Sequence, residues 1–246
     1  MPQDFPDITN VYERFAALTV ESAELGGSLL VHAGLDWRGL ALAMAANIAG
    51  AASLGLEADV ARAKASIRSG ACDFLVNTLD EALRILKNEI RKRKPVAVAL
   101  VGEPRVLVAE IVERGVQPEM VAGDLAGPRW RGDSLGTLVE RGARRLGIGA
   151  AAAGEWVSWR VEREPMRWLP VLDRLAAEAL DPGDKTTAAR RRWLEAAPRY
   201  LGRMLAGERC VRMSAAEYDA FSEATKGGVG VVVMLSRRRG SQTRGL

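Results

Sequence analysis

The chain has 246 residues, of which 48% are hydrophobic and 27% are charged, and its formal net charge is +4 at pH 7. It is long enough to bury a core, and none of its apolar runs reaches the roughly 20 residues that cross a bilayer. We therefore expect a cytoplasmic protein without a membrane partner. Two cysteines and one histidine exclude a disulfide framework and a histidine-rich metal site, and the mixed charges do not favour nucleic-acid binding.

Residues 1–27 are predicted to form one helix, with Asn10 as its N-cap, and a connection that contains two glycines. Beyond them, short apolar runs alternate with amphipathic stretches. The predicted strands are 28–33, 53–57, 72–76, 96–101 and 120–122, and the predicted helices are 40–49, 60–69, 79–91 and 105–114. Because a helix follows almost every strand, the sequence predicts a doubly wound, mainly parallel α/β sheet of the Rossmann type over residues 28–135.

The pattern changes after about residue 127, where strand and helix signals stop alternating. Two amphipathic helices are predicted at 166–180 and 187–205, the second with a kink at Pro198, and one strand is predicted at 229–235. We therefore predict that 136–235 is a mostly helical region with one late strand. Residues 236–246 are expected to form a basic tail.

The loop after the first predicted strand carries the clearest sign of ligand binding. It reads Gly34-Leu35-Asp36-Trp37-Arg38-Gly39, where a dinucleotide-binding fold has G-x-G-x-x-G. Gly34 and Gly39 match the glycines that allow the tight turn and the close helix–strand packing. The middle glycine, which lets the backbone approach a pyrophosphate, is replaced by Asp36. Its carboxylate would repel that ligand, and Arg38 could offset the charge but not the bulk.

Glu57, at the end of the second predicted strand, has the spacing of a ribose-binding residue. An acidic residue about 20 positions after the glycine-rich loop usually accepts hydrogen bonds from the ribose, and Glu57 lies there. The alternative is that Glu57 is a solvated residue at a strand end. Arg62, at the start of the next helix, could reach the same ligand, or it could be an ordinary surface charge.

The histidine and the tryptophans have simpler interpretations. His32 lies within the first predicted strand, where a packed histidine is more common than a catalytic one. We expect four tryptophans to belong to the core of the second half rather than to a base-stacking surface; these are Trp156, Trp159, Trp168 and Trp193.

Four segments of the first half match the pattern of one family in order. They are V-H-A-G-L at 31–35, A-G-A-A-S-L at 49–54, T-L-D-E-A-L at 78–83 and R-G-V-Q-P-E-M-V at 114–121. Together they resemble the central NAD-binding domain of urocanase, the urocanate hydratase of histidine breakdown. The resemblance runs from Asn10 to about Gly127 and covers close to half of the chain.

This resemblance implies a Rossmann-like fold with NAD as cofactor, and Glu57 and Arg62 on the adenosine side of it. The departures fall on cofactor contacts. The family's G-L-G-G-M-G-G loop is replaced by G-L-D-W-R-G-L at 34–40, its glycine-asparagine-alanine turn by Gly102-Glu103-Pro104, and its D-Q-T-S-A-H signature by G-D-L-A-G-P at 123–128. The family's catalytic cysteine loop is not found either. Since its substrate adds to the nicotinamide ring, we expect urocanate hydration to be lost.

These observations leave three functions open. We expect first a urocanase-related dinucleotide- or nucleotide-binding protein without urocanate hydratase turnover. The alternatives are a reduced NAD-dependent urocanate hydratase of histidine degradation, and a non-catalytic interaction protein whose cofactor site is filled by Asp36 and Trp37. A small-molecule ligand and a homo-oligomer are compatible with each. No catalytic residue is assigned, and the predicted cofactor-binding residues are Gly34, Asp36, Arg38, Gly39, Glu57, Arg62 and Gly102.

Overall fold

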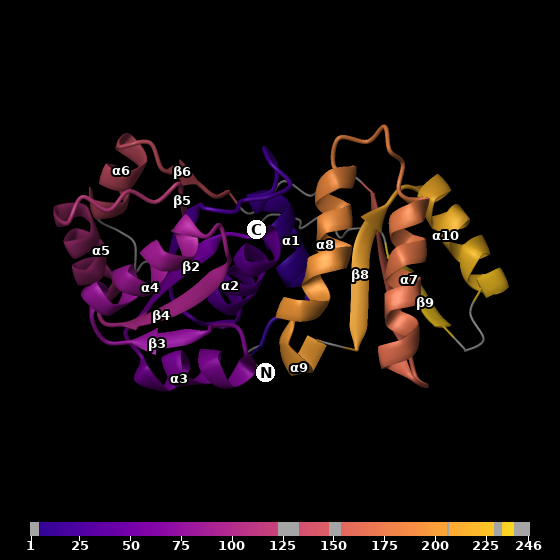
Figure 1. The fold of residues 1–246 in the computed structure, drawn as a ribbon, viewed down its shortest axis with the longest axis horizontal. Helices are drawn as coiled ribbons and strands as arrows, with labels where there is room; N and C mark the ends of the chain where they lie inside the picture. Colours follow the sequence, from indigo (N-terminus) through magenta and orange to yellow (C-terminus); the bar gives the residue numbers. More distant parts are fainter. Residues whose placement is uncertain (1–4, 123–132, 148–153, 206, 229–232, 239–246) are drawn as a thin grey trace, which may run out of the picture.

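The computed structural model describes residues 5–122, 133–147, 154–205, 207–228 and 233–238. It contains two sheets, and helices α1 (Ile8–Leu18) and α8 (Thr187–Tyr200) lie between them (Figure 1). Helix α1 begins after Asp7, whose side chain accepts a hydrogen bond from the N–H of Asn10 at 2.7 Å. Asn10 in turn accepts one from the N–H of Asp7, so it closes a capping box and is not the N-cap that was predicted.

The first sheet is parallel throughout and has the order β3-β4-β2-β1-β5-β6. Its strands are β1 (Leu29–Ala33), β2 (Ala52–Glu57), β3 (Phe74–Val76), β4 (Val96–Val101), β5 (Met120–Ala122) and β6 (Arg144–Arg145). The helices between them are α2 (Trp37–Ala49), α3 (Val60–Ser69), α4 (Leu79–Arg91), α5 (Pro104–Glu113) and α6 (Asp133–Glu140). The predicted doubly wound α/β fold is confirmed.

The two faces of this sheet carry side chains of different size. Beneath α2 the sheet presents small residues such as Gly55, Ala97 and Ala99, and α2 itself is rich in alanine. The other face presents larger residues such as Leu54 and Val98, which pack with α4 and α5. Small side chains let a helix approach the strands closely, and a Cβ on Gly39 of α2 would lie 2.0 Å from the carbonyl oxygen of Gly34 at the end of β1.

The register of the central strands brings Gly34, Glu57 and Gly102 together at the carboxyl ends of β1, β2 and β4. The N–H of Gly34 donates to the carbonyl of Leu56 at 2.8 Å, and the N–H of Gly102 donates to the carbonyl of Glu57 at 3.0 Å. The loops that follow β1, β2 and β4 therefore begin side by side. The chain changes direction across the sheet between β1 and β5, which is where open α/β sheets bind ligands, beyond the carboxyl ends of the strands.

The second half contains a three-stranded antiparallel sheet of order β8-β7-β9. Its strands are β7 (Glu155–Val161), β8 (Glu208–Met213) and β9 (Val233–Arg238), and its helices are α7 (Pro165–Ala179), α8, α9 (Gly202–Leu205) and α10 (Ala215–Gly228). The predicted helices correspond to α7 and to α8 with α9, with the break at Leu201 rather than at Pro198. The late strand is present as β9, residues 229–232 of its predicted range lie outside the described residues, and β7, β8 and α10 were not predicted.

One apolar core joins the two halves. The ring of Trp193 on α8 lies 5.0 Å from that of Tyr12 and 5.3 Å from that of Phe15, both on α1. Arg192 also donates to the carbonyl of Ile48 at the end of α2 at 3.1 Å. Because the same cluster of buried residues runs from Ile8 to Phe221, the domain boundaries at 27/28 and 135/136 remain proposals. Within the described ranges, no helix combines the length and apolar character needed to cross a membrane.

Candidate functional site

The N-terminus of α2 is capped by the carboxylate that replaces the middle glycine of the loop. Asp36 Oδ1 accepts hydrogen bonds from the N–H groups of Arg38 at 3.0 Å and Gly39 at 3.2 Å. These N–H groups have no partner within the helix, and in a dinucleotide-binding fold they are the donors that a phosphate uses. In this chain a carboxylate of the protein itself accepts the hydrogen bonds of these two N–H groups.

The outer glycines of the loop have the backbone roles predicted for them. Gly34 has φ +80°, in the left-handed region that glycine adopts without strain. A Cβ on Gly39 would lie 2.0 Å from the carbonyl oxygen of Gly34, so the first turn of α2 fits against the end of β1 only because residue 39 has no side chain. The tight turn and the close helix–strand packing expected of these two glycines are thus both present.

Glu57 holds two loops together from inside the protein. Its side chain is fully buried, with Oε2 accepting from the N–H of Leu35 at 2.7 Å and Oε1 accepting from the N–H of Asp59 at 2.9 Å. The interpretation of Glu57 as a solvated strand-end residue is therefore wrong. Both carboxylate oxygens already accept hydrogen bonds from backbone groups, which ties the β1–α2 loop to the β2–α3 loop.

Arg62 lies in the first turn of α3, next to the residue that caps it. Asp59 Oδ1 accepts from the N–H of Ala61 at 2.8 Å, and Asp59 Oδ2 lies 3.7 Å from Nε of Arg62. The side chain of Arg62 is 46% exposed. These contacts are those of a surface helix residue paired with a neighbouring acid, and they link Arg62 to Glu57 only through Asp59.

A stack of three side chains lies beside Asp36. The guanidinium carbon of Arg38 is 4.7 Å from the centre of the Trp37 ring, and that of Arg14, which comes from α1, is 5.3 Å from it. Arg38 also lies 3.7 Å from Asp36 Oδ2. Arg14 is buried, which lowers its pKa, and among the described residues its Nε has no hydrogen-bond partner. Sequence reasoning missed Arg14, because nothing in α1 signals that it approaches a loop more than 20 residues away.

Gly102 ends β4 with φ +154°, and a Cβ there would lie 3.1 Å from the side chain of Leu107. It places the start of α5 beside Glu57, and the N-cap of α5, Glu103, makes no side-chain hydrogen bond to the helix. The structure therefore brings Gly34, Glu57 and Gly102 together, with Arg62 at the rim. The replaced signature at 123–128 lies outside the described residues.

His32 lies beneath the start of α2 and is a packed residue, as predicted. It is fully buried, and its ring approaches Gly55 and Gly39 so closely that a Cβ on either glycine would meet it. Burial lowers the pKa of His32 to about 4. The backbone of Gly34 next to the ring acts to raise the pKa of His32, but burial outweighs it, so a neutral ring is what this site stabilises.

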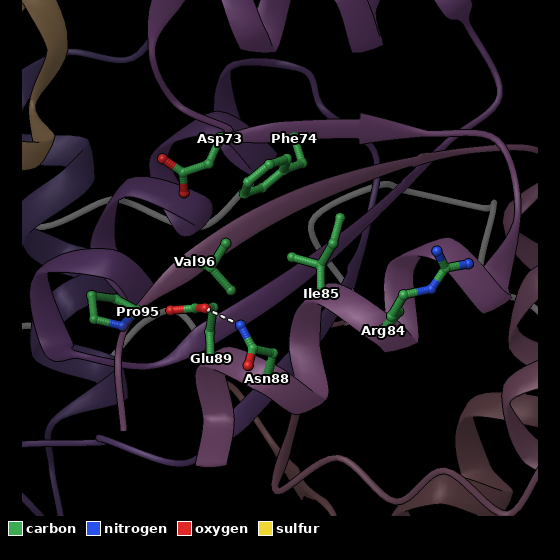
Figure 2. A pocket seen from close by; sticks show the side chains of 8 residues that line it. All are labelled: Asp73, Phe74, Arg84, Ile85, Asn88, Glu89, Pro95 and Val96. Atoms are coloured by element: carbon green, nitrogen blue, oxygen red, sulfur yellow. Dashed lines mark hydrogen bonds between the residues drawn. The ribbon is translucent and has the colours of Figure 1, made fainter. Parts of the chain in front are cut away.

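A concavity lies between the edge strand β3 and helix α4 (Figure 2). We call it the β3–α4 groove. It has a volume of about 730 Å³ and is lined by Asp73, Phe74, Arg84, Ile85, Asn88, Glu89, Pro95 and Val96. Sequence reasoning did not find it, because its lining comes from three separate segments that only the fold brings together.

Comparison with known families agrees with the Rossmann-like fold. Residues 8–126 match the family model described as the urocanase Rossmann-like domain. The match begins at α1, runs past β5, and includes all the predicted cofactor-binding residues. The resemblance inferred from the four sequence segments is confirmed. Residues 8–126 of this chain are therefore similar to the Rossmann-like domain of the urocanase family.

Proposed function

We propose that this protein is a non-catalytic relative of urocanase, in which the nucleotide-binding fold is retained but the dinucleotide site is closed by the chain's own side chains. The observation that carries this proposal is the Asp36 cap, because Oδ1 occupies the N–H groups of Arg38 and Gly39 that a phosphate would need. The protein then acts through its surface rather than through hydration of urocanate.

The energetics favour the cap over a bound phosphate. An aspartate N-cap stabilises a helix by about 0.5–2 kcal/mol, and a phosphate at the same terminus gains about 0.3–2 kcal/mol from the helix dipole. A phosphate that displaced the cap would therefore gain little, and it would also lie close to the Asp36 carboxylate, at a cost of about 1 kcal/mol or more. Glu57 adds to this, because a ribose could reach its buried oxygens only if the loops that they hold were to separate.

One observation favours residual nucleotide binding as a second candidate function. The side chain of Asp36 is 35% exposed, so it can turn towards solvent, and Arg14 and Arg38 would then flank the freed N–H groups of α2. In that arrangement the two guanidinium groups offset the phosphate charge. The displaced Asp36 remains nearby, so binding would be weak until it is replaced.

The test is NAD binding by wild type, Asp36→Gly and a matched control, Asp59→Gly. Both aspartates cap helices that begin beyond the carboxyl ends of the parallel strands, but only Asp36 lies in the glycine-rich loop. Glycine is tolerated at an N-cap with a loss of a few tenths of a kcal/mol, so both variants should fold. We expect no thermal stabilisation of wild type or Asp59→Gly by millimolar NAD, NADH or AMP, and measurable stabilisation of Asp36→Gly.

Stabilisation of wild type by about 2.7 kcal/mol, the value for a ligand at 100 times its Kd, would contradict the closed site and favour the nucleotide-binding candidate. If neither variant responds, Asp36 is not the closing group. Loss of urocanate absorbance above a control without enzyme, with NAD present, would overturn the non-catalytic assignment and favour the reduced hydratase.

A further inference from the structure

Arg14 is a buried cation without a close counter-ion among the residues that the structure describes. It is 4% exposed, and its guanidinium lies 5.3 Å from the ring centre of Trp37, the first residue of α2. Its Nη1 donates to the carbonyl of Asn10 at 2.8 Å, whereas Nε and Nη2 form no hydrogen bond with a described residue. A buried charge that lacks a close partner is costly, so a group that supplies one is bound favourably.

The carboxylates whose charges act on Arg14 are held by other groups. They belong to Glu13, Asp36 and Asp7. Asp7 and Asp36 cap helices α1 and α2. Glu13 Oε1 lies 3.9 Å from Nη2 of Arg212. Their attraction does not offset desolvation, because the pKa of Arg14 is still lowered. The positive charge of Arg14 is therefore available to a carboxylate from outside the chain.

The charges at the start of α2 favour a carboxylate over a phosphate. Arg14 and Arg38 lie against the ring of Trp37, and Asp36 Oδ2 lies 3.7 Å from Arg38, which leaves one excess positive charge. A carboxylate neutralises that charge, and its two oxygens match the donors of a guanidinium. A phosphate dianion would exceed it and would need the N–H groups of Arg38 and Gly39, which already donate to Asp36.

Arg14, Trp37 and Arg38, which we call the Arg–Trp–Arg stack, have the composition of a protein-binding surface. Trp37 is half-buried and Arg38 is 46% exposed. Tryptophan and arginine are the residues that most often dominate binding at protein interfaces. Small molecules bind mainly in concave sites, but neither the β3–α4 groove nor the smaller concavity between α4 and the end of α5 includes any residue of the stack.

We propose that the Arg–Trp–Arg stack binds an acidic side chain of a partner protein, whose carboxylate becomes the close counter-ion of Arg14. Arg38 adds attraction at longer range, and an apolar part of the same partner packs against the exposed part of Trp37. This inference rests on the proposed function, because it requires the N–H groups at the start of α2 to remain with Asp36 rather than with a phosphate.

The test is binding of a blocked glutamate, N-acetyl-glutamate N-methylamide, to the full chain without nucleotide. Binding is followed by NMR at the side-chain N–H signals of Trp37 and Arg14. The neutral glutamine analogue is the matched ligand. Wild type should bind the glutamate probe saturably with a Kd of about 1 mM, the scale expected for a ligand of its size. The glutamine probe should bind about tenfold or more weakly, because it carries no charge.

Three variants locate the binding. Arg14→Met should abolish binding of the glutamate probe and leave the melting temperature unchanged or raised, because it removes a buried cation that has no close partner. Arg38→Gln should fold as wild type does and bind the probe severalfold more weakly. Arg62→Gln is the matched control, because Arg62 is equally exposed at 46% but pairs with Asp59 in the first turn of α3, and it should bind as wild type does.

Equal binding of the two probes, or glutamate binding that survives Arg14→Met, would overturn the proposal. A large fall in the melting temperature of Arg14→Met would show that Arg14 serves the fold instead. Tighter binding of a free acid such as urocanate than of the blocked glutamate would make the stack a small-molecule site. Absence of glutamate binding overturns this inference alone, whereas stabilisation of wild type by NAD overturns the closed dinucleotide site and this inference with it.

Discussion

Arg190 and Glu217 form a two-armed ion pair inside the second half of the chain. Nη1 of Arg190 lies 2.8 Å from Oε2 of Glu217, Nη2 lies 2.9 Å from Oε1, and both side chains are about 5% exposed. Glu217 also accepts hydrogen bonds from the N–H groups of Asp181 and Ser214. One carboxylate therefore connects α8, the start of α10 and the loop after α7.

Removal of the Glu217 charge should destabilise the protein strongly. In Glu217→Gln, Arg190 remains buried without its main counter-ion, and such a change typically costs about 3–5 kcal/mol. The control is Glu223→Gln, whose ion pair with Lys226 is exposed and should contribute less than about 1 kcal/mol. The measurement is urea unfolding followed by circular dichroism, and equal losses in the two variants would contradict the structural role of this pair.

The stabilisation from the Arg190–Glu217 ion pair should be lost in acid. Desolvation acts to raise the pKa of Glu217, but its hydrogen bonds to Arg190, Ser214 and Asp181 outweigh it and lower the pKa to about 2. Because the folded-state pKa lies below the unfolded value of about 4.3, this stabilisation is complete above that pH and is lost as pH falls towards 2. The difference in unfolding free energy between wild type and Glu217→Gln should therefore shrink over that range. A difference that stays constant down to pH 2 would show that Glu217 titrates normally.

The titration of His32 should make the free energy of unfolding depend on pH between about 4 and 6.5, above the range in which Glu217 acts. Its pKa is about 4 in the folded protein, because the ring is buried, and about 6.5 in the unfolded chain. Between these values the unfolded chain binds a proton that the folded protein does not, so the unfolding free energy should fall by about 3 kcal/mol as pH drops from 6.5 to 4. His32→Thr should lose this slope whatever its absolute stability, and an unchanged slope would mean that other groups cause it.

The first half of the fold could be predicted because its strands are buried on both faces. Continuous apolar runs such as 96–101 then mark the strands without any need for alternation. The start of α2 was placed too late because Asp36 was taken as part of a phosphate loop, although aspartate is a strong N-cap. The sequence offered a site filled by Asp36 only as an alternative, because a single sequence does not show which N–H groups the carboxylate would accept from.

Strand β8 of the second half was missed for a different reason. Strand β8 contains Arg209 and Arg212, both almost fully buried, so its pattern does not separate an apolar face from a polar one. Arg209 is held by Asp173 at 3.0 Å, and Arg212 lies over the ring of Trp156 at 4.4 Å. Partners from distant segments make these arginines compatible with the interior, and a single sequence does not reveal such pairs.

The close approach of α2 to β1 gives a test of the glycine roles in the loop. Gly39→Ala should destabilise the protein by more than about 2 kcal/mol, because its Cβ would lie 2.0 Å from the carbonyl oxygen of Gly34. Gly136→Ala, in α6, has no atom within 4 Å of the added Cβ and should be neutral or stabilising by up to about 1 kcal/mol. Similar melting temperatures for the two variants would show that α2 can shift away from the strand.

The effect of Glu57→Ala on stability shows whether this carboxylate is structural or serves only to bind a ribose. Glu57→Ala leaves the N–H groups of Leu35 and Asp59 without their acceptor, and each buried donor that loses its partner costs about 1–3 kcal/mol. We therefore expect Glu57→Ala to lower the stability of the protein clearly in the absence of any ligand. If the carboxylate served only to bind a ribose, its removal would leave the stability unchanged or raise it. The control is Glu110→Ala, because Glu110 lies on the surface of α5, is 34% exposed and pairs with Arg114. If Glu57→Ala unfolds at the same urea concentration as wild type, the loops do not depend on Glu57, and its carboxylate is available for a ligand after all.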